Sequence, residues 1–233
     1  MIKNMNNSVS IIIPALNEAG NIEKTIQNVL LALENQELSD YEIIIINDGS
    51  TDETGKIAAG LSINNERIKV MSNPKPKGLG YNIRIGIRAA VKDYVGWFPG
   101  DNQIILESIQ KIFEQIGKTD AIIPYVANPK QRTFFRLMLS RSYTMTFNVL
   151  FGLHLKYFNG PCFFRRDALK DIVMTTDSPA YMAEILVQLV KKKTPYVEVP
   201  FCNQERVYGK SSVIKWKNVF LIGKTIINLA RII

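Results

Sequence analysis

Hydrophobic residues in the first half of the chain form short continuous runs that alternate with amphipathic segments. Runs rich in β-branched residues at 9–14, 41–47, 68–73, 94–99 and 120–125 predict strands buried on both faces. The segments 15–35, 48–61, 77–91 and 105–117 carry hydrophobic side chains at helical spacing or begin with helix-capping residues. This alternation predicts right-handed crossovers and a Rossmann-like α/β fold, with a mainly parallel sheet flanked by helices.

The second half of the chain has a different pattern. Residues 132–153 predict a long apolar helix with basic groups, and 159–169 predict a turn, a short strand and the start of a helix. A further helix is expected over 178–193, a strand over 196–201 and an amphipathic helix over 213–233. We therefore predict one main domain, residues 1–212, followed by a C-terminal amphipathic helix, residues 213–233.

Three polar clusters follow predicted strands of this sheet. They are Pro14–Glu18 after the first strand, Asn47–Ser50 after the second and Gly100–Gln103 after the fourth. Each cluster alone is typical of a helix cap or an Asx turn. In parallel α/β sheets, however, ligands bind outside the carboxyl ends of the strands. Three such clusters at one edge therefore predict a ligand site, in which carboxylates could hold Mg²⁺ or Mn²⁺ against substrate phosphates.

The net charge of +8 over 233 residues is unevenly placed. Residues 128–156 carry five basic side chains and residues 206–233 carry six, and neither segment contains an acid. The rest of the chain has 18 basic and 21 acidic residues, so a mildly acidic body carries two basic, apolar segments. No nucleic-acid motif accompanies them, and an anionic membrane surface or a phosphorylated substrate is the expected partner.

The remaining composition excludes several classes of site. Cys162 and Cys202 do not suggest a disulfide framework, and buried thiols are expected. The single histidine, His154, lies in an apolar helical pattern, which favours a structural role. The sequence therefore does not favour a His-based metal site or a Ser-His-Asp triad. The polar start, residues 1–7, does not resemble a signal peptide.

Several motifs together resemble family 2 glycosyltransferases of the GT-A fold. The matching segments are "SIIIPALNEAGNI", "YEIIIINDGSTDET", "KGLGYNIRIGIRAA" and "GDNQ", and the resemblance spans roughly residues 8–212. The chain looks most similar to the branch of dolichyl- and polyprenyl-phosphate sugar synthases. The resemblance implies an inverting transfer of a sugar from a nucleotide-sugar donor.

The resemblance also implies roles for individual residues. Those implied to contact the donor are Pro14, Leu16, Glu18, Asp48, Lys77, Arg84, Asp101, Arg206 and Lys210. Asp101 matches the second Asp of the family's D-x-D motif, and Gln103 follows two residues later, so both would face Mg²⁺ or Mn²⁺ and the diphosphate. "RLMLSR" at 136–141 resembles the branch's membrane-facing helix, and Glu184 matches an acid of a later helix.

The sequence departs from the family pattern at four places. Pro99 replaces the first Asp of D-x-D, which removes one metal ligand. Leu16 replaces a Tyr, the Arg expected near Val126 is absent, and Ser212 replaces a terminal Lys. An altered donor or acceptor is consistent with these changes, and a non-catalytic nucleotide-sugar-binding protein is an alternative.

Two acceptors remain open at this stage. A phosphate acceptor is already ionised near neutral pH and needs basic groups to hold it, and the candidates are Arg132, Arg136, Arg141 and Arg206. Arg136 and Arg141 are predicted to be catalytic, together with Asp101 at the metal and diphosphate. A hydroxyl on a glycan or lipid-linked saccharide would instead need a general base, and Glu184 is the matched acid.

The C-terminal tail points to a membrane surface. Lys217, Lys224, Asn228 and Arg231 fall on one stripe of a helix, and the longest stretch without a charge is shorter than the ~20 residues needed to span a bilayer. A core-packed helix is the alternative. We expect a peripheral protein at the cytoplasmic face of a membrane, with polyprenyl phosphate or another lipid-linked acceptor as its second substrate.

Overall fold

The computed structural model describes residues 7–128, 134–205, 208 and 216–233. The strands in these ranges are β1 (Val9–Ala15), β2 (Tyr41–Asn47), β3 (Ile68–Ser72), β4 (Tyr94–Trp97), β5 (Ala121–Val126), β6 (Phe163–Arg165) and β7 (Tyr196–Phe201). The helices are α1 (Ile22–Asn35), α2 (Thr54–Asn64), α3 (Leu79–Ala89), α4 (Leu106–Phe113), α5 (Phe134–Phe151), α6 (Tyr181–Lys191), α7 (Trp216–Ile232) and the short 3₁₀ helix η2 (Arg166–Leu169).

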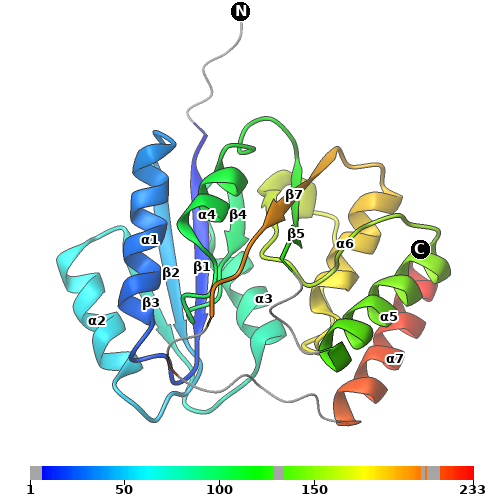
Figure 1. The fold of residues 1–233 in the computed structure, drawn as a ribbon, viewed down its shortest axis with the longest axis horizontal. Helices are drawn as coiled ribbons and strands as arrows, with labels where there is room; N and C mark the ends of the chain where they lie inside the picture. Colours follow the sequence, from blue (N-terminus) through cyan, green and yellow to red (C-terminus); the bar gives the residue numbers. More distant parts are fainter. Residues whose placement is uncertain (1–6, 129–133, 206–207, 209–215) are drawn as a thin grey trace, which may run out of the picture.

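The strands form one sheet in the order β3-β2-β1-β4-β6-β5-β7 (Figure 1). β1 pairs in parallel with β2 and β4, so that Ile11 lies opposite Ile43 on one side and Gly96 on the other. β5 and β7 are also parallel, whereas β6 runs antiparallel to both of its neighbours. The predicted mainly parallel α/β fold is confirmed.

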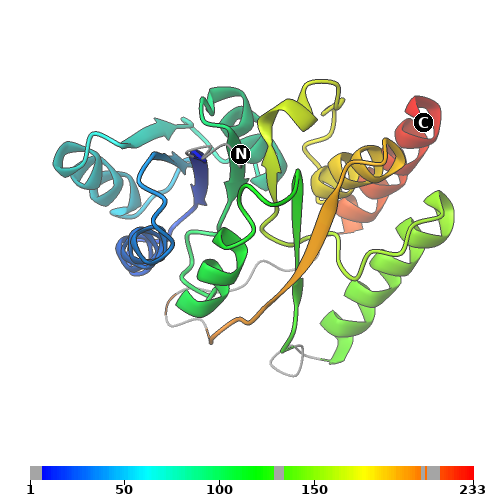
Figure 2. The ribbon, with the colours of Figure 1, turned by 90° about the horizontal axis from the view of Figure 1, so that it is seen from above.

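Helices cover both faces of the sheet because alternate side chains of each buried strand point to opposite sides. In β1, Ile11 and Ile13 belong to the core beneath α1 and α4, and Ile12 belongs to the core beneath α3 and α6. The view from above separates these two layers, with α5 and α7 on the side of the molecule away from α1 and α2 (Figure 2).

The antiparallel strand β6 depends on a glycine in its neighbour. Gly96 of β4 lies opposite Phe163 of β6 in the sheet. A Cβ atom on Gly96 would lie 2.2 Å from the ring of Phe163, so only glycine leaves room for this ring. Phe163 fills that space, where it packs against Phe98 and Phe113.

The long helix α5 ends earlier than the hydrophobic pattern predicts. The prediction was 132–153, but the helix ends at Phe151 and Gly152 adopts a left-handed φ of 60°. The Leu153 N–H donates to the Asn148 carbonyl, as in a Schellman motif. His154 therefore lies beyond the helix rather than within it.

The predicted amphipathic tail is helical where it is described, as α7. The boundary that we predicted between residues 212 and 213 lies outside the described residues. Among the helices that are described, none combines the length and the apolar character that a bilayer crossing requires.

Candidate functional site

The first two polar clusters are joined at the carboxyl edge of β1 and β2. Asn17 adopts a left-handed φ of 56°, a conformation that asparagine tolerates better than most residues. Its side-chain oxygen accepts a hydrogen bond from the Thr51 N–H at 2.9 Å, and its own N–H donates to Ser50 Oγ at 3.0 Å. The Asp48 N–H donates to the Ala15 carbonyl at 2.8 Å. The loops after β1 and β2 therefore form one unit.

Asp48 lies at the centre of this edge and is 3% exposed. Its carboxylate accepts hydrogen bonds from the backbone N–H groups of Lys77 and Gly78, at 2.8 and 2.9 Å, and from Asn73 Nδ2 at 2.8 Å. The conformation of the loop before α3 is thus fixed by a buried carboxylate. Gly78, with a φ of 94°, gives this loop a backbone geometry that L side chains rarely adopt.

Glu18 holds the start of α1 and is 8% exposed. Its N–H donates to Thr54 Oγ1 at 2.8 Å, its carboxylate accepts from Asn21 Nδ2 at 2.7 Å, and its carbonyl accepts from Asn21 and Ile22. Pro14 is half-buried in β1, and Leu16 in the following loop is 42% exposed. An exposed leucine at this edge is a surface on which a planar ring could rest.

Asp52 ties the same loops together. Burial alone raises the pKa of the Asp52 carboxyl, but hydrogen bonds from Thr54 and the Ala19 N–H outweigh it and lower the pKa below 3.8. The carboxylate is therefore ionised throughout the physiological range. It fixes the loop after β1 to the start of α2.

The third cluster follows β4 and contacts the first. The Gly100 N–H donates to the Pro14 carbonyl at 3.2 Å, and Thr25 Oγ1 donates to the Gly100 carbonyl at 3.1 Å. Asp101 is half-buried, and its Oδ1 accepts from the Gln103 N–H at 3.2 Å in an Asx turn. The three predicted clusters therefore do meet at one sheet edge, on the adjacent strands β2, β1 and β4.

The donor set at this edge fits a Mg²⁺ or Mn²⁺ ion only in part. In the described residues, no group of three or more His, Cys, Asp or Glu side chains is arranged to hold a metal. Asp101 and the amide of Gln103 supply oxygen, and Pro99 supplies none. Because Mg²⁺ is often held by one or two carboxylates together with substrate phosphates, one carboxylate is compatible with an ion that arrives with a diphosphate.

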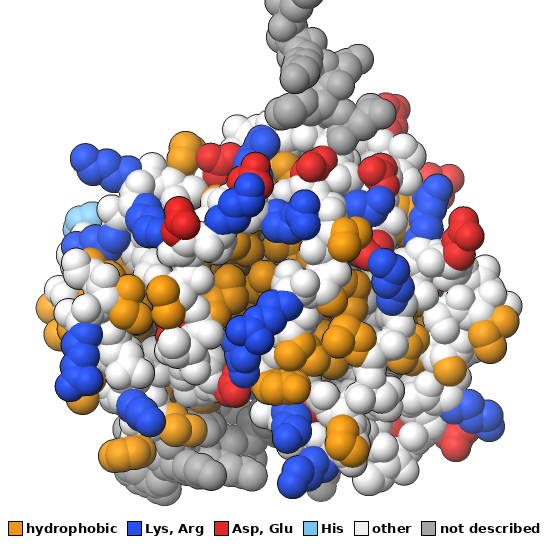
Figure 3. Space-filling view, turned by 180° about the vertical axis from the view of Figure 1, so that it is seen from behind, with side chains coloured by type: hydrophobic (Ala, Val, Ile, Leu, Met, Phe, Trp, Pro, Cys, Tyr) orange, Lys and Arg blue, Asp and Glu red, His pale blue; other side chains and the backbone are white. Residues whose placement is uncertain are grey.

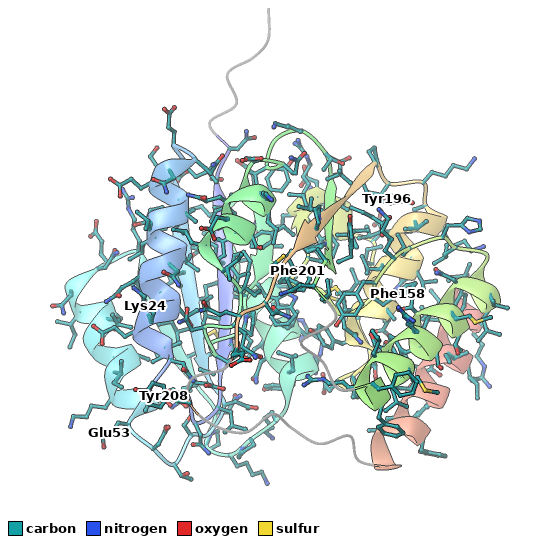
Figure 4. The ribbon with its side chains drawn as sticks, in the orientation of Figure 1. Lys24, Glu53, Phe158, Tyr196, Phe201 and Tyr208 are labelled. Atoms are coloured by element: carbon teal, nitrogen blue, oxygen red, sulfur yellow. The ribbon has the colours of Figure 1, made fainter. Side chains whose placement is uncertain are left out.

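Tyr208, which lies between the predicted donor contacts Arg206 and Lys210 in the sequence, is placed beside the first cluster. The Tyr208 ring contacts Gly20 so closely that a Cβ atom there would lie 2.8 Å from it, and the Tyr208 carbonyl accepts from Asn21 Nδ2. Figure 4 shows Tyr208 at this end of the molecule, well beyond Phe201 of β7. Arg206 and Lys210, which we predicted to bind the donor, lie outside the described residues.

Lys77 and Arg84, predicted to face the donor, flank one aromatic ring. Lys77 Nζ lies 5.9 Å and the Arg84 guanidinium 5.4 Å from the centre of the Tyr81 ring. Arg84 also forms a two-pronged ion pair with Asp177, with N–O distances of 2.8 to 3.1 Å. The orientation of the Arg84 guanidinium is therefore set by the loop that contains Asp177, which the sequence analysis did not assign to the donor site.

Glu184, the candidate for a general base, is buried and hydrogen-bonded to a turn of its own chain. It lies on α6, is 1% exposed, and its carboxylate accepts from Thr175 Oγ1 at 2.6 Å and from the Thr175 and Thr176 N–H groups at 3.0 and 3.1 Å. A general base must reach the substrate hydroxyl. The structure instead places Glu184 as the residue that holds the 175–176 turn.

The predicted phosphate-binding arginines lie on α5. Arg136 and Arg141 are both exposed, and Arg141 lines a pocket of about 470 Å³ between β5 and α5. The other residues of this pocket are Tyr125, Val126, Leu137, Ser140, Thr144, Met145, Asn148, Lys156 and Tyr157. The pocket combines two cations with an apolar wall, which suits an anion that carries a hydrocarbon chain.

Sequence reasoning missed Lys156 and Asn73. Lys156 Nζ lies 4.3 Å from the centre of the Tyr125 ring and 4.0 Å from a Glu198 carboxylate oxygen. Lys156 was counted only as part of a basic segment, because nothing in the sequence brings the 153–158 segment back to the end of β5. Asn73 is the last residue of the predicted strand 68–73, and the same strand-end rule that identified the other clusters could have found it.

The sheet topology, with polar loops at the carboxyl edge of its central strands, defines an α/β fold of the GT-A type. Glucosyl-3-phosphoglycerate synthase from Mycobacterium tuberculosis, solved with Mg²⁺ and uridine diphosphate, superposes with a TM-score of 0.65 at 16% identity, covering 96% of this chain and 77% of that one. The model of glycosyl transferase family 2 matches residues 10–173. The chain belongs to this family.

Curated relatives add finer similarities. The chain is 29% identical over 221 residues to a dolichol-phosphate mannosyltransferase of Pyrococcus furiosus, covering 91% of this chain and 60% of the relative. It is 25% identical to an undecaprenyl-phosphate 4-deoxy-4-formamido-L-arabinose transferase of Sodalis glossinidius, covering 92% and 65%. The uncharacterized glycosyltransferase EpsJ of Bacillus subtilis is 32% identical, covering 59% and 40%. The chain thus spans 40 to 65% of the length of these relatives.

Proposed function

We propose that this protein transfers a sugar, with inversion, from a nucleotide-sugar donor to polyprenyl phosphate at a membrane surface. The single observation that carries the choice of acceptor is the pocket between β5 and α5. It places Arg141 and Lys156 beside Leu137, Met145 and aromatic side chains. The names of two relatives that match over nine-tenths of the chain, each a transferase for a polyprenyl-type phosphate, agree with this choice.

The donor binds at the carboxyl edge of β1, β2 and β4 in this proposal. Pro14, Leu16 and the ordered loop around Asp48 receive the nucleotide, with Lys77 in the loop before α3 and Arg84 on α3 beside it. Asp101 stands next to this edge, where its carboxylate and the amide of Gln103 would hold Mg²⁺ or Mn²⁺. When bound, such an ion stabilises the negative charge of the leaving diphosphate.

The proposed reaction needs no general base. An ionised phosphate oxygen of the acceptor attacks the anomeric carbon of the sugar and forms the new C–O bond. The bond between that carbon and the diphosphate oxygen breaks, and its electron pair stays on the nucleotide diphosphate. Arg141 and Lys156 hold the acceptor phosphate, and the absence of a reachable carboxylate at Glu184 is consistent with an acceptor that arrives ionised.

The outer faces of α5 and α7 supply the membrane contact. Phe134, Met138, Met145 and Val149 follow helical spacing along α5 and are 50 to 77% exposed. On α7, Phe220 and Ile227 are exposed at 77 and 56%, on the same face as the exposed Lys224 and Arg231. The left half of the rear view in Figure 3 shows hydrophobic and basic side chains next to one another. Such a face suits an anionic lipid interface.

Transfer from labelled sugar nucleotides tests the proposal. Uridine- and guanosine-diphosphate sugars are each incubated with Mn²⁺ and either polyprenyl phosphate or a lipid-linked glycan. We expect label in polyprenyl phosphate. Label in the glycan alone would establish a hydroxyl acceptor, and nucleotide binding without transfer to either would leave a binding protein.

Two variants link that activity to the site. We expect Asp101→Asn to lower kcat at least about a hundredfold, because it removes the one acid placed to hold the ion at the diphosphate.

We expect Arg141→Ala to raise the KM for polyprenyl phosphate while the KM for the donor changes little. Asp171→Asn and Lys111→Ala, at exposed positions away from the site, are the matched controls.

A further inference from the structure

A short turn at 175–178 joins three helices that are distant in the sequence. Glu184 of α6 accepts three hydrogen bonds from Thr175 and Thr176. The turn is closed internally by a hydrogen bond from the Ser178 N–H to Thr176 Oγ1 at 3.1 Å. α6 therefore gives the turn a rigid base, and its other contacts reach α3 and α7.

The contact with α3 involves both the side chain and the backbone of Asp177. The Asp177 carboxylate forms the two-pronged ion pair with Arg84, and its backbone packs directly on Gly80. A Cβ atom on Gly80 would lie 2.8 Å from the Asp177 carbonyl carbon and oxygen. The first two turns of α3 thus rest on the 175–178 turn.

The start of α3 in turn fixes the donor loop. Asn73 Nδ2 contacts both Asp48 Oδ1 and Asn82 Oδ1 at 2.8 Å, and Asn82 is 1% exposed. The Lys77 and Gly78 N–H groups bind the Asp48 carboxylate directly before α3 begins. A displacement of α3 by the length of one hydrogen bond would therefore move the groups that surround Asp48.

The contact with α7 is a cluster of three hydroxyl groups. Thr225 is 2% exposed, and its Oγ1 lies 3.0 Å from Thr176 Oγ1 and 3.1 Å from Ser178 Oγ. It also lies 3.0 Å from the Leu221 carbonyl in its own helix. A hydroxyl offers one proton and two lone pairs, so three partners can use its full capacity. Between residues 220 and 233 of α7, Thr225 and Leu229 are buried against the body of the protein.

We infer that Asp177 and Thr225 are positioning residues for donor binding, and that the 175–178 turn couples the position of α7 to the conformation of the loop around Asp48. Neither residue needs to touch the donor. The inference rests on the proposed function in one respect, namely that a nucleotide binds beside Asp48. The inference also gives α7 a second role beside attachment to the membrane. Its exposed apolar and basic face would contact the lipid, and its buried face would support the donor site.

Nucleotide affinity, measured by calorimetry with UDP and with GDP in the presence of Mn²⁺, tests the inference without requiring transfer. We expect Thr225→Val, which keeps the shape but removes the hydroxyl, to weaken nucleotide binding at least about fivefold, the lower range of typical coupling between sites. Thr225→Ser should restore the affinity. Asp177→Asn should weaken binding similarly, and the double variant should lose less than the product of the single losses because both act through one turn.

Thr146→Val is the matched control. Thr146 makes the same hydrogen bond to the carbonyl four residues earlier, in α5, but it is exposed and contacts no part of the turn. If Thr225→Val does not fold, as judged by circular dichroism, Asp177→Asn decides the question, because the Asp177 side chain is 42% exposed and its replacement leaves the core unchanged.

The two failures are distinguishable. If the unaltered protein binds neither nucleotide, the proposed function fails. If the unaltered protein binds one nucleotide, the proposed function stands and the variants decide the positioning role. That role is overturned if Asp177→Asn or a folded Thr225→Val binds this nucleotide with unchanged affinity. It is also overturned if Thr225→Ser does not restore the affinity that Thr225→Val loses.

Discussion

At the scale of single residues, Glu42 in β2 is a buried acid with three hydrogen-bond donors. Its carboxylate accepts from Ser10 Oγ and Lys69 Nζ, both at 2.7 Å, and from the Val91 N–H at 2.9 Å. Burial by itself raises the pKa of the Glu42 carboxyl, but these hydrogen bonds outweigh it and hold the pKa below 4.5. An ionised carboxylate thus joins β1, β2, β3 and the segment before β4.

We expect Glu42→Gln to reduce the free energy of unfolding by about 1–3 kcal/mol near neutral pH, because an amide cannot accept from all three donors in the same way. A depressed pKa in the folded state stabilises the protein above the pKa of the unfolded state, and this contribution is lost as the pH falls through the folded pKa. The difference between the two proteins in urea unfolding should therefore shrink below about pH 4.5.

Glu23→Gln, an exposed position on α1, is the control and should change the stability little at any pH. A Glu42→Gln protein as stable as the original at pH 7 would show that the hydrogen bonds of this carboxylate contribute nothing net.

Prediction from the sequence succeeded at the residue scale where chemistry follows a strand end. The clusters around Asn17, Asp48 and Asp101 meet as expected, because adjacent parallel strands bring their carboxyl ends to one edge. The sequence did not indicate the partners of Glu184 or the role of Asp177. The partners of these two acids, on the 175–176 turn and on α3, are brought to them by the packing of helices, which no local pattern encodes.

At the scale of elements, the end of α5 illustrates a local signal that overrides hydrophobic periodicity. The apolar pattern continues to residue 153, but Gly152 turns the backbone into the left-handed region and ends the helix at Phe151. A Cβ atom on Gly152 would meet no other atom within 4 Å. The position therefore isolates the effect of backbone conformation from the effect of packing.

We expect Gly152→Ala to destabilise the protein by about 1–2 kcal/mol, the cost of placing an L side chain in the left-handed region. Gly60→Ala is the paired variant. Gly60 lies inside α2, also with no atom near the added Cβ but without a positive φ, so alanine there should stabilise by about 0.5–1 kcal/mol. Thermal unfolding of both variants checks the prediction, and changes of the same sign would contradict it.

Element prediction was most accurate for strands buried on both faces, such as 41–47, because a continuous β-branched run has few alternative structures. The short strand near 163–165 was expected, but its place in the sheet was not. β6 inserts between β4 and β5 because Gly96 leaves space for Phe163, a fit that depends on two residues 67 positions apart in the sequence.

At the scale of the whole molecule, two helices without acidic residues, α5 and α7, carry a surface that is both basic and apolar. The acids Glu18, Asp48 and Asp52 organise the loops around α1, α2 and α3, whereas α5 and α7 present exposed Phe, Met and Ile side chains together with Arg and Lys. This arrangement supports the proposal that one side of the protein lies on a membrane while the carboxyl edge of the sheet stays accessible to a water-soluble donor.

We expect the protein to float with vesicles that contain phosphatidylglycerol and to bind less at high salt, because attraction between Lys or Arg and anionic lipid is screened. A Phe220→Ser, Ile227→Ser variant of α7 should bind these vesicles more weakly while its thermal stability changes little, since both side chains are already exposed. Ile63→Ser, at an exposed position on α2, is the control. Equal flotation of all three proteins would remove α7 from the membrane contact.

The sequence by itself determined the fold class, the carboxyl edge that holds the polar clusters and the amphipathic character of the tail. These features follow from periodicity and from the rule that parallel strands end at one edge. Only the tertiary structure decided that Asp48 orders the donor loop, that Lys156 joins Arg141 at one pocket and that Thr225 meets the 175–178 turn. Each of these features depends on how segments distant in the sequence pack against one another. Such contacts cannot be predicted from the hydrophobic periodicity of any one segment.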